Sequence, residues 1–81
     1  MVTVRPIDLR EKRRGLRLTQ AELGRRLRLS GAHVYRMEAG LRSVSFPVAL
    51  KCAELFGSLR VRHRGMVFTL SAGGEAGRRG G

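Results

Sequence analysis

The sequence predicts one small, mainly helical domain of four to five helices, followed by a short β-hairpin or strand segment. Helix caps and helix-ending glycines alternate with apolar residues at helical spacing over residues 6–57, whereas residues 59–70 are rich in β-favouring side chains. The chain has 81 residues, which limits it to a single small core. Association with a second copy is therefore an expected source of additional stability.

An extended N-terminal arm, residues 1–5, is expected to precede the first helix. The proline that follows the arm suits the first turn of a helix, and Gly15 interrupts the helical pattern. The helix is therefore expected to end near Arg14. Leu9 and Leu16 are expected to face the core, with the basic residues on the outside.

The next segment, residues 19–40, predicts two short helices joined by a tight turn. Thr19 and Ser30 are favourable N-caps, and Glu22 completes a capping box with Thr19. Each helix has one stripe expected to be buried: Leu23, Gly24 and Leu27 on the first, and Val34, Met37 and Glu38 on the second. Gly40 ends the second helix. Because so short a connection forces the two helices to cross steeply, the segment predicts a helix-turn-helix.

A further helix is expected over residues 45–56, capped by Ser45 and ended by Gly57. One continuous face of it is apolar: Phe46, Ala49, Leu50, Ala53 and Phe56. A second apolar stripe lies on the other flank: Val48, Cys52 and Leu55. The helix must therefore be covered on more than one side.

The segment 58–70 is the expected cover, as a strand or hairpin. Its first half alternates apolar and basic residues, its second half is β-favouring, and Arg64-Gly65 between them is a candidate turn. Residues 71–81 have the low-complexity sequence SAGGEAGRRGG and are expected to form a disordered tail. The chain thus divides into an arm (1–5), a helical domain (6–57), this C-terminal segment and the tail.

Charge indicates the kind of partner. Lysine and arginine number 17 against six acidic residues, which gives a formal net charge of +11 and a pI near 11.8. Such a chain favours a polyanion: nucleic acid first, an anionic membrane surface second. No run of 18 apolar residues and no signal peptide is visible, so the sequence predicts a cytoplasmic protein outside the membrane.

The residues that carry chemistry are few and scattered. Cys52 is the only cysteine and is expected to be a small buried apolar side chain. His33 and His63 have no companions at metal-ligand spacing, and no catalytic grouping is recognisable. We therefore expect no enzyme activity, no metal and no cofactor.

The helix-turn-helix segment and its continuation resemble the Cro/phage-repressor (Xre) family. The resemblance is carried by Thr19-Gln20, Ala21-Glu22-Leu23-Gly24, Ser30 and Glu38-Ala39-Gly40, and it extends over roughly residues 9–57. It implies a lambda-repressor-like bundle that binds double-stranded DNA. The chain departs from the family at residues 59–70, where many members have a fifth helix. It also departs at Arg28, where glycine is usual and a positive φ would cost an arginine about 1 kcal/mol.

The second helix of the motif is the expected reading element. With Val34 and Met37 in the core, Ala32, Tyr35 and Arg36 point away from it. The resemblance places Gly31, Ala32 and Arg36 at base-reading positions. Arg36 has the side chain that can donate two hydrogen bonds to guanine, while a phosphate contact or a surface ion pair remains the alternative.

The resemblance also implies the anchoring residues. Gln20 opens a helix, where unpaired N–H groups attract phosphate, and the loop Arg42-Ser43 matches a second phosphate clamp. His33 and Tyr35 flank the reading face. They either contact the DNA backbone or lie on the surface without a function. Glu38 is expected to pair with Arg13 as a structural ion pair.

Two functions from different classes fit these features. One is a transcriptional regulator that binds a palindromic operator as a homodimer; the other is an antitoxin-type protein that mainly binds a toxin-like protein partner and represses its own gene. Charge-driven association with RNA is a third and weaker reading. The dimer is expected to form through residues 59–70 and the C-terminal half of the preceding helix, with four side chains buried: Val61, Met66, Phe68 and Leu70.

Overall fold

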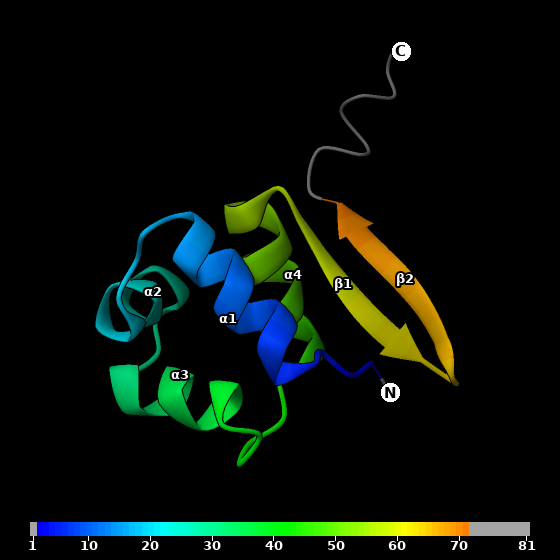
Figure 1. Ribbon diagram of the computed structural model, residues 1–81, viewed down its shortest axis with the longest axis horizontal. Coiled ribbons are helices and arrows are strands. Elements are labelled where there is room, and N and C mark those ends of the chain that lie inside the picture. Colours follow the sequence, from blue (N-terminus) through cyan, green and yellow to red (C-terminus); the bar gives the residue numbers. More distant parts are fainter. Residues whose placement is uncertain (1, 72–81) are drawn as a thin grey trace.

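The computed structural model describes residues 2–71, which fold as four helices followed by a two-stranded antiparallel hairpin (Figure 1). The elements are α1 (Pro6–Gly15), α2 (Gln20–Leu27), α3 (Gly31–Glu38), α4 (Phe46–Phe56), β1 (Ser58–His63) and β2 (Met66–Ser71). The predicted fold class is confirmed, with four helices in the described part of the chain. The expected tail lies outside the described residues, except for Ser71, which ends β2.

Side-chain caps define where three of the helices begin. The hydroxyl of Thr19 accepts a hydrogen bond from the Glu22 backbone at 3.0 Å, and the Glu22 carboxylate accepts one from the Thr19 backbone at 2.8 Å. Ser30 and Ser45 cap α3 and α4 in the same way, at 3.0 and 3.4 Å. Each cap satisfies backbone donors that have no partner inside the helix. The expected helix starts are therefore correct.

The core lies where α1, α4 and β1 meet the helix-turn-helix. Its fully buried large side chains come from each of these parts: Leu9, Leu23, Val34, Met37, Cys52 and Leu59. Leu16, expected inside, is 45% exposed and lies just past the end of α1 at Gly15. Burial of this one small core is the main stabilising term of the fold.

The expected apolar face of α4 is only partly covered. Ala49 and Ala53 are buried, whereas Phe46 and Leu50 are 47% and 41% exposed. The covered side runs instead through Ala49, Cys52 and Ala53, whose small side chains let the neighbouring elements approach closely. The prediction was wrong for Phe46 and Leu50, which lie on the surface.

The hairpin forms at the expected turn. Arg64 and Gly65 both have positive φ, 54° and 77°, as a two-residue hairpin loop requires. The strands pair in register, with Val61 opposite Phe68. β1 also pairs on its other side, because Thr3 exchanges two backbone hydrogen bonds with Arg62 at 2.8 and 2.7 Å. In the described part of the expected arm, Thr3 is therefore held against β1.

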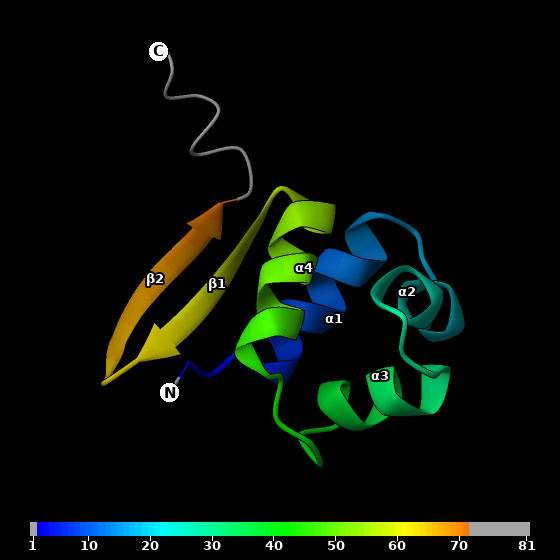
Figure 2. The ribbon, with the colours of Figure 1, turned by 180° about the vertical axis from the view of Figure 1, so that it is seen from behind.

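The helix-turn-helix and the hairpin lie at opposite ends of the molecule, with α1 and α4 between them (Figures 1 and 2). α2 and α3 contact each other, and β1 contacts both α4 and α1. Within residues 2–71, no helix has the length and apolar character needed to cross a membrane.

Candidate nucleic-acid interface

The turn between α2 and α3 sets how the outer helix is presented. Arg28 ends α2 in the left-handed conformation, with φ 61° and ψ 41°. A Cβ atom placed on Gly24 would lie 2.6 Å from the carbonyl oxygen of Leu29, so the turn closes against α2 at a position that admits only hydrogen. This close approach produces the steep crossing of the two helices.

One face of α3 is anchored and the opposite face is exposed. Val34 and Met37 are buried, whereas Ala32, Tyr35 and Arg36 are exposed. Within residues 2–71 no salt bridge holds Arg36. The helix therefore presents a free guanidinium on its outer surface, as the spacing predicted.

Gly31 begins α3 and lies against α2. A Cβ atom there would lie 3.1 Å from the Cα of Ala21, which is tighter than ordinary packing. Gly31 is thus the point where α3 and α2 touch, a role in packing that the resemblance did not suggest.

Glu38 is the centre of a buried polar network. Its carboxylate, 1% exposed, accepts hydrogen bonds from the Arg13 guanidinium at 2.6 and 3.0 Å. Arg13 also donates to the Leu18 carbonyl at 2.8 Å. Hydrogen bonding to Glu38 raises the pKa of Arg13 above its ordinary value, against the opposing effect of burial. The network ties α1 to the end of α3.

Two further residues join this network. The Gln20 amide donates to the Glu38 carboxylate at 3.2 Å, and the Arg10 guanidinium lies 3.9 Å from that carboxylate and donates to the Glu38 carbonyl at 3.4 Å. An amide group has two hydrogens, so Gln20 keeps one for another acceptor while Glu38 holds its orientation. Neither contact was predicted, although Arg10 stands three residues before Arg13 on the same side of α1.

The loop after α3 forms a hollow beside that helix. Its volume is about 440 Å³, and it brings His33 of α3 together with Arg42 and Ser43. Ser45, the N-cap of α4, also lines it, with Leu29, Met37 and Val48 as the apolar floor. Basic, hydroxyl and imidazole groups around the positive end of a helix favour an anion.

The described part of the chain offers few groups for metal binding or for nucleophilic chemistry. Residues 2–71 contain no group of three His, Cys, Asp or Glu side chains placed to hold a metal. Cys52 is buried, and desolvation raises the pKa of its thiol to about 12, so the reactive thiolate is disfavoured at neutral pH.

Comparison with known proteins agrees with this geometry. A family model described as helix-turn-helix matches residues 9–61, well over half of the chain. No curated protein and no solved structure matches the chain. The matched residues contain α2, α3 and the network around Glu38. The chain belongs to the Cro/phage-repressor (Xre) family of helix-turn-helix proteins, a family of DNA-binding transcription regulators.

Proposed function

We propose that this protein is a sequence-specific regulator that places α3 in the major groove of a palindromic operator and binds there as a dimer. The exposed Arg36 on the outer face of α3 carries this proposal. Its helix is fixed from behind by Val34 and Met37 in the core and by Glu38 in the buried network. A rigid helix with a free guanidinium suits base recognition.

Direct reading of bases rests on few side chains. Arg36 donates two hydrogen bonds to guanine O6 and N7, and Ala32 offers a methyl contact to thymine. Gly31 has no side chain to offer. The remaining discrimination comes from the shape and deformability of the DNA.

Phosphate contacts orient the domain on the duplex. Gln20 donates its second amide hydrogen to one phosphate while Glu38 fixes the first. Arg42 and Ser43 bind a second phosphate at the hollow beside α3, with His33 at the same rim. Tyr35 is exposed two residues further along α3, and therefore on the other flank of the helix. These contacts position the domain and are insensitive to sequence.

Exposed apolar side chains support the dimer. Met66 and Phe68 on β2 are 61% and 45% exposed, and Phe46 and Leu50 of α4 add to the exposed apolar surface. Leu70 is partly buried. Val61, expected at the interface, is 3% exposed and fills the core of its own chain, so the proposed contact rests on the other side chains.

The outer edge of β2 supports the same proposal. Arg62 directs its N–H and C=O groups away from β2, toward Thr3. The direction of the backbone N–H and C=O groups alternates along an antiparallel ladder. The partner of Arg62 is Val67, so the N–H and C=O groups of Val67 point away from β1. The same holds for Thr69, two residues further along β2. No described strand lies there. Pairing with the same strand of a second copy would satisfy this edge around a two-fold axis.

Binding titrations on the DNA upstream of the protein's own gene test the proposal. A scrambled duplex of equal length and composition is the control, at the same moderate salt. We expect tighter binding to the upstream DNA by at least about a thousandfold, the lower range for specific binders. Equal affinity for both duplexes would reject a sequence-specific role.

The exposed β2 edge also favours a second candidate function. An antitoxin-type protein would use this edge to bind an extended segment of a protein partner by strand addition. Purification of the full chain from its native host distinguishes the two functions, because a stoichiometric toxin-like partner is expected only for the second.

A further inference from the structure

A second basic surface lies on the hairpin, away from the helix-turn-helix. It consists of Arg60 and Arg62 on β1 and Arg64 in the turn, which we call the hairpin arginines, and all three are exposed. Leu59 and Val61 fill the core, so the alternating Arg60 and Arg62 share the opposite face of the strand. Two residues along a strand span about 7 Å, which places the two guanidinium groups side by side.

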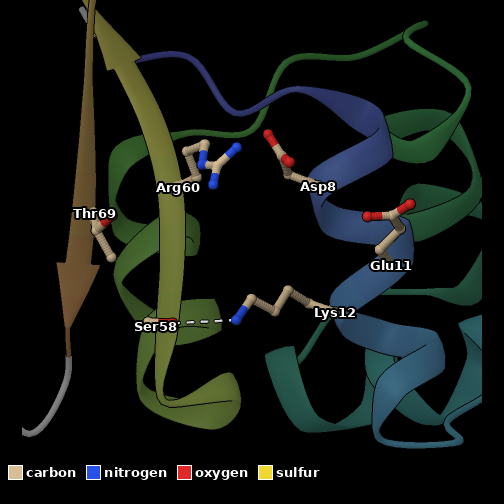
Figure 3. Close-up of a pocket in the computed structure, with 6 residues that line it drawn as sticks. All are labelled: Asp8, Glu11, Lys12, Ser58, Arg60 and Thr69. Atoms are coloured by element: carbon tan, nitrogen blue, oxygen red, sulfur yellow. Dashed lines mark hydrogen bonds between the residues drawn. The ribbon is translucent and has the colours of Figure 1, made fainter.

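The acidic residues near this surface do not cancel its charge. Figure 3 shows Arg60 extending from β1 toward Asp8 of α1, across a cleft of about 290 Å³ that Glu11 and Lys12 also line. Asp8 is already bound by Arg5, with two hydrogen bonds at 2.9 and 3.1 Å.

Arg60 and Arg62 therefore meet a carboxylate whose charge is already balanced. The hydrogen bond from Arg5 is the main reason that the pKa of Asp8 lies below its ordinary value, and the fields of Arg60 and Arg62 add to it. Lys12 donates to the Ser58 hydroxyl at 3.1 Å and adds another positive charge. Glu11 is the one exposed carboxylate in the cleft, and it lies on α1 and not on the hairpin.

The hairpin turn and α3 lie along the same margin of the molecule. Figures 1 and 2 show both at the lower edge of the view, with the loop between α3 and α4 beside them. The described residues extend 39 × 28 × 19 Å, and the view is along the shortest axis. A duplex that lies along this margin can therefore meet α3 at one end and the hairpin turn at the other.

We propose that the hairpin arginines bind the phosphate backbone of duplex DNA, extending the interface beyond the base pairs that α3 reads. This inference rests on the proposed function, because it adds a second contact to the same duplex. Arginines on a strand face bind phosphates through charge and paired donors, and they read no base. The contact raises affinity for every sequence alike.

The salt dependence of binding tests this inference. The double variant Arg60→Ala/Arg62→Ala is titrated against upstream and scrambled DNA at several salt concentrations. The plot of log K against log salt concentration has a negative slope, and each lost phosphate contact makes it shallower by about 0.9. We therefore expect the slope of the double variant to be shallower by nearly two on both duplexes. The ratio of the two affinities should stay as in the wild type.

Two control variants make the result specific. Arg60→Lys/Arg62→Lys keeps both positive charges and should keep most of the salt dependence. If the alanine variant lost binding only because it folded poorly, restoring the charges would not restore the salt dependence. Arg25→Ala/Arg26→Ala removes the same charge from exposed positions on α2, at the other end of the molecule, and should change the slope much less.

The outcomes separate this inference from the proposed function. An unchanged slope in the hairpin double variant, or the same loss in the α2 variant, would overturn the hairpin contact while specific binding stands. If the wild type binds both duplexes equally but the hairpin variant still loses slope, sequence-specific reading fails and the hairpin contact stands. If the wild type binds neither duplex, both are overturned.

Discussion

At the scale of single residues, the fold depends on one buried carboxylate. Glu38 is almost fully enclosed, and a charge in that position is costly unless it is paired and fully hydrogen-bonded. Arg13 supplies two hydrogen bonds and Gln20 a third. The network also links α1 to the C-terminal end of α3.

Removing this carboxylate should destabilise the domain strongly. Glu38→Ala leaves the Arg13 guanidinium without its partner in a mostly enclosed position, so we expect a loss of about 3–5 kcal/mol in the free energy of unfolding. Urea denaturation followed by circular dichroism measures this loss. Glu54→Ala, at an exposed site on α4, is the matched control and should change stability by less than about 0.5 kcal/mol. Equal stability of the two variants would contradict the structural role of the network.

Arg28 stores backbone strain at the motif's turn. Its φ of 61° is costly for a residue with a Cβ atom, whereas glycine adopts it freely. Glycine relieves this strain but makes the unfolded chain more flexible, which offsets part of the gain. Arg28→Gly should therefore increase the free energy of unfolding by about 0.5–1 kcal/mol, which is seen as a higher thermal midpoint. A lower midpoint would show that the Arg28 side chain contributes more than the strain costs.

At the scale of elements, the caps made the helices predictable. Thr19, Ser30 and Ser45 act locally, so their sequence context was sufficient to place three helix starts. The turn at Arg64-Gly65 was likewise a local signal. Elements defined by short-range hydrogen bonds can therefore be derived from the sequence.

The covered face of α4 could not be derived in this way. Periodicity groups residues on a face but does not say which face a neighbour covers, and α4 has two competing apolar stripes. The structure covers Ala49, Cys52 and Ala53 and leaves Phe46 and Leu50 outside. The same limit applies to Gln20 and Arg10, whose contacts with Glu38 depend on how α1, α2 and α3 come together.

The crossing of α2 and α3 should be sensitive to one methyl group. Gly24→Ala places a carbon within 2.6 Å of a backbone oxygen that cannot rotate away, so the turn must shift. We expect a loss of about 1–3 kcal/mol, measured by urea denaturation, although alanine is the better helix former. Gly15→Ala, where the added carbon meets nothing within 4 Å, is the matched control. Similar stability of both variants would mean that the turn is loosely packed.

At the scale of the whole molecule, the proposed dimer depends on the hairpin. β1 belongs to the core, because Leu59 and Val61 are buried, so deleting the hairpin would damage the fold itself. β2 contributes exposed apolar side chains and an open edge. A point substitution on β2 is therefore the appropriate probe of association.

Phe68→Glu should weaken the proposed dimer. The side chain is 45% exposed on the same face of the hairpin as Val61, and a carboxylate there would be buried on the proposed association. Light scattering at micromolar concentration should give a dimer mass for the wild type and a monomer mass for Phe68→Glu. Leu41→Glu, at a 72% exposed position in the loop between α3 and α4, is the control and should remain dimeric. A monomeric wild type would reject the proposed dimer.

The central claim is that α3 reads DNA sequence through Arg36, and one comparison tests it most directly. Fluorescence anisotropy titrations of Arg36→Ala and Arg42→Ala are measured on the upstream duplex and on its scrambled control. Arg36→Ala should lose roughly 1–3 kcal/mol on the upstream duplex and little on the scrambled one, whereas Arg42→Ala should weaken both alike. If Arg36→Ala instead loses the same affinity on both duplexes, Arg36 is a phosphate contact and α3 does not read the sequence through it.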